Sequence, residues 1–337
     1  MRIESSVVSV SWIPSEAMTG PMRVPMDIGV GHYDVPPPDL IEDLDALEKL
    51  RQADRFRFAN ELTAWVEVED GAITGAGYSG GGHIGVTTVS FGVGHLSIPA
   101  VAFPDIQADP VVRSDSVRFV QTAGGRTGAP MPRRVSRPPY VKVTAPTAWT
   151  TLALEINADG SSSFEVVGAS PFPRHWIYDD TGALAAKSGI IDFSTWTHEH
   201  FGDNTPWGNV ESPALVTAAE SALERELSLR IMGGKHKPRI SHLDEGADLV
   251  TEGEASTEMY LLLDGVLEVE VDGTVVTQVG PGAILGERAA LEGGKRTATL
   301  RAVTPVKVAV THPEQIEQSV LEELAAGRRS APSTADG

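Results

Sequence analysis

The chain has no cysteine among its 337 residues. This absence excludes disulfides, thiolate zinc sites, iron–sulfur clusters and cysteine nucleophiles, and it fits a reducing compartment. Positive charge is also scarce, because 27 Lys and Arg stand against 46 Asp and Glu and give a formal net charge of −19. A broad nucleic-acid-binding surface needs clustered Lys and Arg, so the composition argues against one. A local basic site for one small anion is still compatible with this charge.

Long apolar runs are missing as well. No stretch approaches the roughly 18 apolar residues that a membrane-spanning helix needs, and residues 1–16 lack the basic and apolar pattern of a secretory signal. We therefore expect no membrane span and a cytoplasmic location. At about 150 residues per domain the length suggests two domains, and the hydrophobic content of 41% is enough to build their cores.

Residues 1–210 show short strand-like segments separated by turns that are rich in Gly and Pro. The clearest segments are Ser6–Trp12, Thr63–Glu69, Val86–Phe91, Ser116–Gln121, Tyr140–Thr144, Leu152–Ile156 and Ser163–Val167. Asp70-Gly71 is typical of a tight hairpin turn. This spacing predicts a β-rich sandwich or barrel-like domain. Its function does not follow from its sequence.

One helix is predicted to interrupt these strands. Asp39 is a suitable N-cap, with Glu42 three residues later as in a capping box. Leu40, Leu44 and Leu47 then form the apolar stripe of the helix.

A longer helix is predicted over residues 212–232. Ser212 can cap it, and Pro213 stands at the first helical position. Apolar residues then recur every four positions, at Leu215, Ala219, Leu223, Leu227 and Ile231. Such a face must pack on something, so we assign residues 211–238 to a connecting helix and linker.

From residue 239 the pattern becomes more informative. The strand-like segments Glu258–Leu263, Val266–Val271 and Thr274–Val279 alternate with Asp-Gly turns. A glycine-containing cassette over 286–298 and two more strands follow. A helix over Pro313–Ala326, with Ile316, Val320 and Leu324 on one side, closes the segment. Residues 327–337 are a polar tail that we expect to be disordered.

Residues 239–326 resemble the cyclic-nucleotide-binding domain found in the catabolite activator protein and in the regulatory subunits of cyclic-AMP-dependent protein kinase. The likeness rests on Glu252-Gly253-Glu254, the strand Met259–Leu263, Gly280-Pro-Gly282, and Gly286-Glu287 followed by Arg296-Thr297-Ala298. Glu287 and Arg296 are nine residues apart, as in the phosphate-binding cassette of that family. The resemblance covers no part of residues 1–210. It implies a β jelly roll with flanking helices, so the whole chain is expected to be mainly β.

The residue types of the cassette suit a cyclic nucleotide, which has one phosphate charge and a free 2′-hydroxyl. Gly286 lets the backbone pass close to a ligand, and the short helical turn after it favours an anion. Arg296 offers a planar fork of donors for phosphate oxygens. Glu287 only accepts, so it suits a hydroxyl and can also hold the arginine in position. The resemblance assigns Glu287 to the ribose hydroxyl and Arg296 to the cyclic phosphate.

Three further residues complete the expected ligand site. Thr297 and the Ala298 amide can add donors. Threonine at this position occurs in family members that accept cyclic GMP and also in members that prefer cyclic AMP. The sequence therefore does not decide between adenine and guanine as the preferred base. Arg288 stands where many relatives have an aliphatic residue, and it either brings a second positive charge to the site or faces solvent.

One weaker pattern lies in the N-terminal region. His198-Glu199-His200 would place two imidazoles on one face of a strand, near Asp192 or Asp203, which makes a metal site conceivable. A loop packed over a domain edge explains the same residues, and no third ligand is fixed. We predict no metal site, no resident cofactor and no catalytic residue.

The preferred functional hypothesis is a regulator in which cyclic AMP or cyclic GMP controls an N-terminal output domain. An enzyme whose N-terminal domain is gated by the nucleotide is the alternative, and a structural protein with a non-binding jelly roll is less favoured. A DNA-binding factor is disfavoured, because no recognition-helix pattern is present and few residues follow the last strand. The N-terminal domain could hold a second copy of the chain or another protein.

Overall fold

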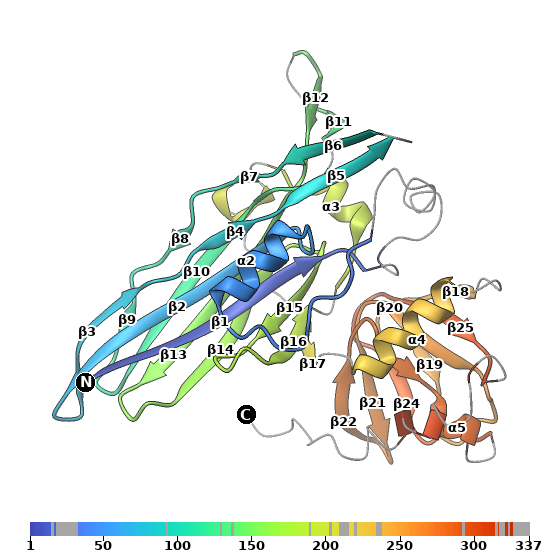
Figure 1. Cartoon of the computed structure of the whole chain (residues 1–337). Helices are drawn as coiled ribbons and strands as arrows, with labels where there is room; N and C mark the ends of the chain where they lie inside the picture. The colour runs from blue at the N-terminus through green and yellow to red at the C-terminus, as the bar shows by residue number, and fades with distance from the viewer. Residues whose placement is uncertain are drawn as a thin grey trace. The chain divides into compact units, whose positions relative to one another are not determined.

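The computed structural model describes residues 1–14, 17, 33–91, 94–128, 130–135, 138–188, 190–201, 204–208, 216–218, 221–233, 238–291, 294–313, 316, 321–322 and 324–325. The chain divides into two compact units (Figure 1). The N-terminal unit comprises Met1–Pro14, Met18–Ser188 and Asp192–Ala214, and the C-terminal unit is essentially Leu215–Gly337. Strands dominate both units, so the prediction of a mainly β protein is confirmed. In the described part of the chain, no helix has the length and apolar character needed to cross a bilayer.

The N-terminal unit is built on two antiparallel sheets. The first has the order β16-β15-β1-β2-β3, with β4 also paired to β2; its strands are β1 (Arg2–Trp12), β2 (Phe58–Glu69), β3 (Ala72–Tyr78), β4 (Gly82–Ile84), β15 (Arg174–Tyr178) and β16 (Leu184–Ser188). The second has the order β14-β13-β10 and continues through short strands paired to β10; its strands are β7 (Val101–Ala102), β8 (Ile106–Gln107), β9 (Val111–Val112), β10 (Ser116–Arg126), β13 (Thr147–Asn157) and β14 (Ser162–Ala169). Two separate hairpins are β5 (Val86–Phe91) with β6 (Gly94–Pro99), and β11 (Met131–Arg134) with β12 (Val141–Thr144).

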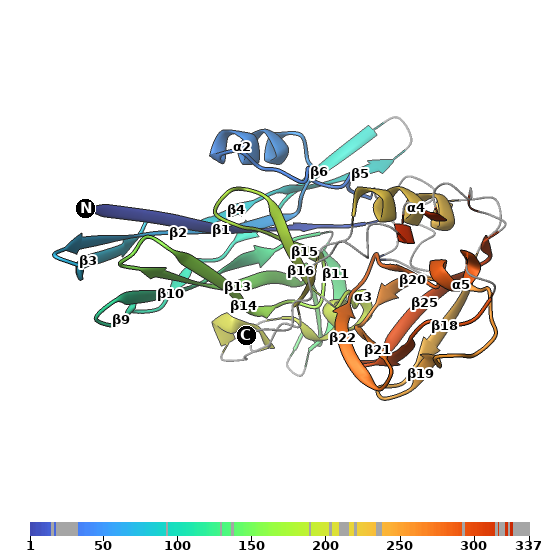
Figure 2. The same ribbon diagram turned by 90° about the horizontal axis from the view of Figure 1, so that it is seen from below.

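The first sheet is covered on both faces, as Figure 2 shows with α2 (Leu44–Gln52) on one side of β1 and β2 and the second sheet on the other. Toward α2, Val10 and Trp12 join the apolar cluster that contains Leu47. Toward the second sheet the contact includes a buried polar pair, because the hydroxyls of Ser9 and Thr150 lie 2.6 Å apart. The layered arrangement is therefore a β-sandwich with a helix on its outer face.

The predicted strands are present, and most are longer than expected. Val86–Phe91 has the expected bounds, whereas the predicted Leu152–Ile156 extends to the whole of β13. The Asp70-Gly71 hairpin is confirmed, since both residues have positive φ, +51° and +79°, as a two-residue turn of this kind requires.

The predicted start of the first helix is wrong. Helix α2 begins at Leu44, and the side chain of Asp43 caps it by accepting from the amide of Ala46 at 2.7 Å. Asp39 and Leu40 pair instead with the 182–184 turn through backbone hydrogen bonds and a β-bridge. Pairing with a distant strand end therefore prevails over the local capping signal of Asp39.

A buried histidine gives the N-terminal unit a predictable pH dependence. Complete burial lowers the pKa of His175 to about 4. Its Nε2 lies 2.8 Å from the carbonyl oxygen of Ser170, which can only accept, so Nδ1 accepts from the hydroxyl of Ser11 at 2.6 Å. The neutral ring is thus fully hydrogen-bonded.

We expect acid to destabilise this unit through His175. The unfolded histidine takes up a proton near pH 6.5 and the folded one only near pH 4, so stability falls as pH drops between these values, by on the order of 3 kcal/mol. All six tryptophans lie in residues 1–214, so denaturation followed by tryptophan fluorescence reports on this unit. His175→Gln should flatten the pH profile over this range, and an unchanged profile would contradict the assignment.

The C-terminal unit consists of two facing antiparallel sheets. Their orders are β18-β25-β20-β23 and β19-β24-β21-β22. The strands and the short helix between β23 and β24 are β18 (Arg239–Leu243), β19 (Asp248–Val250), β20 (Met259–Asp264), β21 (Leu267–Val271), β22 (Thr274–Val279), β23 (Ile284–Leu285), α5 (Glu287–Leu291), β24 (Thr299–Ala302) and β25 (Val306–Thr311).

Strand β20 is buried on both faces and organises this unit. Tyr260 and Leu262 point into the core between the sheets. Met259 and Leu261 pack on the opposite side in a second cluster, with α4 (Ala222–Gly233) and with Ile316, Leu321 and Leu324. Most of the helix predicted over 313–326, including Val320, lies outside the described residues.

The predicted connecting helix begins later than expected. Residues 216–218 are a strand, β17 (Val216–Ala218), and the expected cap at Ser212 lies outside the described residues. Ser221 and Glu224 form a capping box at the start of α4, with the Glu224 amide donating to the Ser221 hydroxyl at 3.2 Å and the Ser221 amide donating to the Glu224 carboxylate at 2.9 Å. The predicted apolar face is present from Leu223 through Leu227 to Ile231.

Candidate functional site

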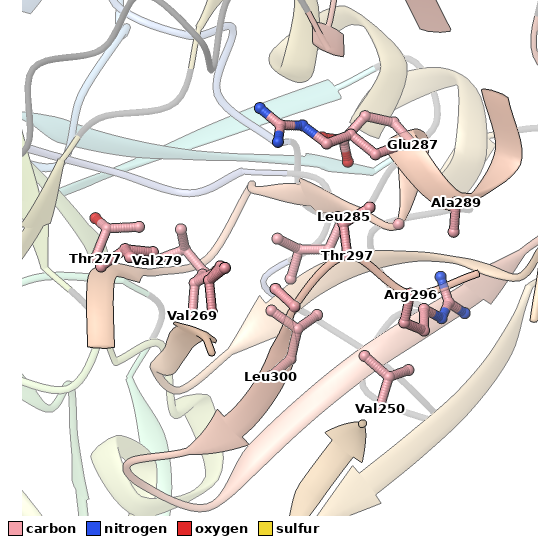
Figure 3. Close-up of a pocket in the computed structure, with 15 residues that line it drawn as sticks. Val250, Val269, Thr277, Val279, Leu285, Glu287, Ala289, Arg296, Thr297 and Leu300 are labelled. Atoms are coloured by element: carbon pink, nitrogen blue, oxygen red, sulfur yellow. The ribbon is translucent and has the colours of Figure 1, made fainter. Parts of the chain in front are cut away.

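A cavity of about 200 Å³ lies in the C-terminal unit, between α5 and the strands that flank it. Figure 3 shows Val269, Thr277 and Val279 toward one end of the cavity and Arg296 with Ala289 toward the other. The cavity therefore has an apolar end formed by β21 and β22 and a cationic end.

Backbone geometry at the start of α5 permits this arrangement only with glycine. Gly286 has a φ of +92°, and a Cβ there would lie 2.7 Å from Nη1 of Arg296 and 2.8 Å from the carbonyl oxygen of Glu258. Both distances are shorter than real Cβ contacts, so any side chain would displace the guanidinium or the backbone.

The cationic end of the cavity is a buried guanidinium. Arg296 is only 4% exposed, and its Nη2 donates to the hydroxyls of Ser256 at 2.8 Å and Tyr260 at 3.2 Å. Its Nε and Nη1 are buried without a hydrogen-bond partner. A buried charge normally needs partners that satisfy it, so two donor nitrogens without a partner, on a residue that lines the cavity, favour an anion as the ligand.

Residues 240–323 match the family model described as the cyclic nucleotide-binding domain. This segment is a cyclic nucleotide-binding domain. The resemblance proposed from the sequence is thereby confirmed for the C-terminal region.

Known relatives resemble parts of the chain. An uncharacterized protein of Mycobacterium tuberculosis, found in two strains, is 30% identical over 122 residues, which are 36% of this chain and 23% of the relative. The chain thus spans about a quarter of the length of these curated relatives. Among solved structures, PKAR CBD2 with bound Sp-2Cl-cAMPS is 20% identical with a TM-score of 0.27, covering 33% of this chain and 72% of that one. A cyclic nucleotide-binding domain from Methylobacillus flagellatus is 24% identical with a TM-score of 0.23, covering 33% and 60%.

The structure brings all six sequence-predicted residues of this domain to one cavity: Gly286, Glu287, Arg288, Arg296, Thr297 and Ala298. Glu287 is 3% exposed, whereas Arg288, Thr297 and Ala298 are partly exposed. The expected support of Arg296 by Glu287 is replaced by another arrangement, because the groups that accept from the guanidinium are the hydroxyls of Ser256 and Tyr260.

Sequence reasoning missed the residues that support Arg296 and the apolar end of the cavity. Ser256 and Tyr260 lie 40 and 36 residues before Arg296, so no local spacing links them. A tyrosine inside the apolar strand Met259–Leu263 was a signal, since a buried hydroxyl usually has a partner. The apolar lining from β21 and β22 consists of Val269, Val271, Val276 and Val279.

The histidine pair of the N-terminal region does not take the expected form. His198 lies in helix α3 (Phe193–Glu199), not in a strand, and His200 caps the end of that helix. Asp192 is the N-cap and accepts from the Thr195 amide at 2.9 Å, while Asp203 lies outside the described residues. Within the residues described, no group of three or more His, Asp or Glu side chains is placed to hold a metal ion.

Replacing Gly286 with alanine should weaken ligand binding in this domain. Gly246→Ala is the matched control, because Gly246 has a φ of +80° and no atom within 4 Å of its Cβ position. Both variants should lose about 1–2 kcal/mol of stability from the left-handed backbone. Only Gly286→Ala also displaces Arg296, so calorimetry with cyclic nucleotides should show an affinity loss of about tenfold or more in that variant alone. Equal affinities in the two variants would contradict this.

Proposed function

We propose that the protein is a cyclic-nucleotide-dependent regulator, in which cyclic AMP or cyclic GMP bound by the C-terminal domain controls the N-terminal unit. The observation that carries this proposal is the buried guanidinium of Arg296, with two donor nitrogens that have no hydrogen-bond partner. A cyclic phosphate is a monoanion with oxygens that can accept from both nitrogens. Binding would therefore supply acceptors for two donor nitrogens that have no hydrogen-bond partner within the protein.

The rest of the cavity suits the rest of a cyclic nucleotide. Glu287 is acceptor-only and lines the cavity, which supports assigning it to the ribose 2′-hydroxyl. The valines of β21 and β22 offer an apolar surface for the flat base, which pockets for small ligands commonly provide. The hydroxyls of Thr277 and Thr297 are the candidates for contacts with the edge of the base.

Helix α4 is the element through which we propose that binding is transmitted. One carboxylate oxygen of Glu224 accepts from Ser221 in the capping box, and the other accepts from the amide of Ile284 at 3.2 Å. Ile284 belongs to β23, two residues before Gly286. A movement of the cassette on binding would therefore act directly on the start of α4.

Calorimetry on the full chain with cyclic AMP and cyclic GMP tests binding, with 5′-AMP as the acyclic control. We expect a cyclic nucleotide to bind at one site per chain and 5′-AMP to bind much more weakly. Hydrogen exchange with and without ligand tests regulation, because a ligand can shift an equilibrium only by binding two states differently. Failure to bind either cyclic nucleotide would refute the proposed ligand, and unchanged protection along 222–233 would refute the coupling.

A further inference from the structure

We infer that the hydroxyl of Tyr260 is a positioning group for the ligand site, which holds Arg296 in its binding orientation while leaving the positive charge of the guanidinium available. This inference rests on the proposed function, because its consequence is measured as affinity for a cyclic nucleotide. It assigns a role to a residue of β20, outside the cassette over 286–298.

A short chain of hydrogen bonds carries the inference. Arg296 Nη2 donates to the Tyr260 hydroxyl at 3.2 Å, and that hydroxyl donates to Oε2 of Glu258 at 3.1 Å. Arg239 reaches the other oxygen, Oε1 of Glu258, at 3.3 Å from the outside. The carboxylate thus lies one hydroxyl away from the guanidinium and has its own exposed cationic partner.

The hydroxyl of Tyr260 is uncharged, which distinguishes it from a carboxylate in the same position. A carboxylate bonded directly to Arg296 would neutralise the guanidinium and compete with an incoming phosphate. Tyr260 and Ser256 instead fix the direction of Nη2 through oxygens that carry no charge. The Nε and Nη1 atoms remain without partners, so the guanidinium stays oriented and its charge is still free to bind an anion.

The aromatic ring and the hydroxyl of Tyr260 have separable roles. The ring belongs to the core between the two sheets and lies with its centroid 5.2 Å from Cζ of Arg296. Phenylalanine would keep both the packing and the ring under the cation, and it would remove only the hydroxyl. Burial and the neighbouring Glu258 raise the pKa of the Tyr260 hydroxyl, against the opposing effect of Arg296, so it remains a protonated donor at neutral pH.

Tyr260→Phe tests this role by calorimetry on the full chain. We expect the affinity for cyclic AMP or cyclic GMP to fall about 10- to 150-fold, the usual effect of losing one hydrogen bond to a charged group. Affinity for the corresponding nucleoside, which has no phosphate, should stay within twofold of the wild type. Glu258→Gln keeps an acceptor for the hydroxyl, so it should retain most of the wild-type affinity.

The control variant is Tyr78→Phe, which removes a hydroxyl bonded to the backbone oxygens of Ala108 and Val120 in the N-terminal unit. It should leave nucleotide affinity unchanged. Unaltered cyclic nucleotide affinity in Tyr260→Phe would overturn the inference, and so would an equal loss for nucleotide and nucleoside, which indicates damage to the whole pocket. If the wild type itself binds no cyclic nucleotide, the proposed function fails instead.

Discussion

Arg296→Ala is expected to weaken the binding of cyclic AMP or cyclic GMP by about 2–5 kcal/mol, which is roughly 30- to 5,000-fold in affinity. The reason is that the variant removes the buried positive charge and both free donor nitrogens at the cationic end of the cavity. The phosphate would then be desolvated without a charged partner, which costs more than the loss of a surface ion pair. Calorimetry on the full chain measures the change.

The matched control is Arg301→Ala in the same domain. Arg301 is 39% exposed and pairs with Asp248 and Glu270, and it does not line the cavity. An exposed ion pair contributes about 0–1 kcal/mol, so this variant should keep its affinity. Unchanged affinity in Arg296→Ala, or an equal loss in both variants, would contradict the assignment of Arg296 to the phosphate.

Stability without ligand gives an independent check on Arg296. Burying the guanidinium costs free energy, and its removal offsets the lost hydrogen bonds to Ser256 and Tyr260. We therefore expect the ligand-free variant to unfold at nearly the same denaturant concentration as the wild type. A large loss of ligand-free stability would instead identify Arg296 as a structural residue.

Local signals in the sequence were sufficient for the tight turns, and the resemblance to a known domain located the cassette. Gly286, Glu287 and Arg296 could be placed together because a short, nearly continuous segment carries them, and Asp70-Gly71 or Asp272-Gly273 specify their turns through positive φ. Such features depend on residues only a few positions apart, so a single sequence contains the information for them.

Features that depend on distant pairing could not be derived in this way. Strand β1 pairs with β15 about 165 positions later, and the β-bridge between Leu40 and Ala183 moves the start of α2 to Leu44. The hydrogen bond from Arg296 to Tyr260 also depends on distant segments, since it requires β20 and β24 to face each other across a core. The start of α4 was predicted wrongly for a different reason. The capping box Ser221-Ala-Leu-Glu224 was present in the sequence, but Ser212-Pro213 offered a competing signal for the helix start.

Asp34→Ala is expected to destabilise the N-terminal unit by about 3–5 kcal/mol, the usual cost of leaving one member of a buried ion pair alone. The Asp34 side chain is fully buried, and its Oδ1 and Oδ2 lie 2.8 and 3.2 Å from Nη2 and Nε of Arg57. The same carboxylate also accepts from the amide of Ile13 at 2.8 Å, so the variant leaves a buried guanidinium underpaired and a backbone donor without its acceptor. Asp54 also pairs with Arg57, but its side chain is partly exposed, so this ion pair offsets only part of the lost stability.

Urea denaturation followed by tryptophan fluorescence measures this loss in the N-terminal unit alone, because the C-terminal unit has no tryptophan. Glu165→Ala is the control, since it removes a carboxylate that is 60% exposed and pairs with Arg118 on the surface; it should cost less than about 1 kcal/mol. If Asp34→Ala shifts the unfolding midpoint no further than Glu165→Ala, the buried pair does not stabilise the sandwich. Calorimetry with cyclic nucleotide on the same variant should give wild-type affinity, because the ligand cavity is built wholly from residues 250–300.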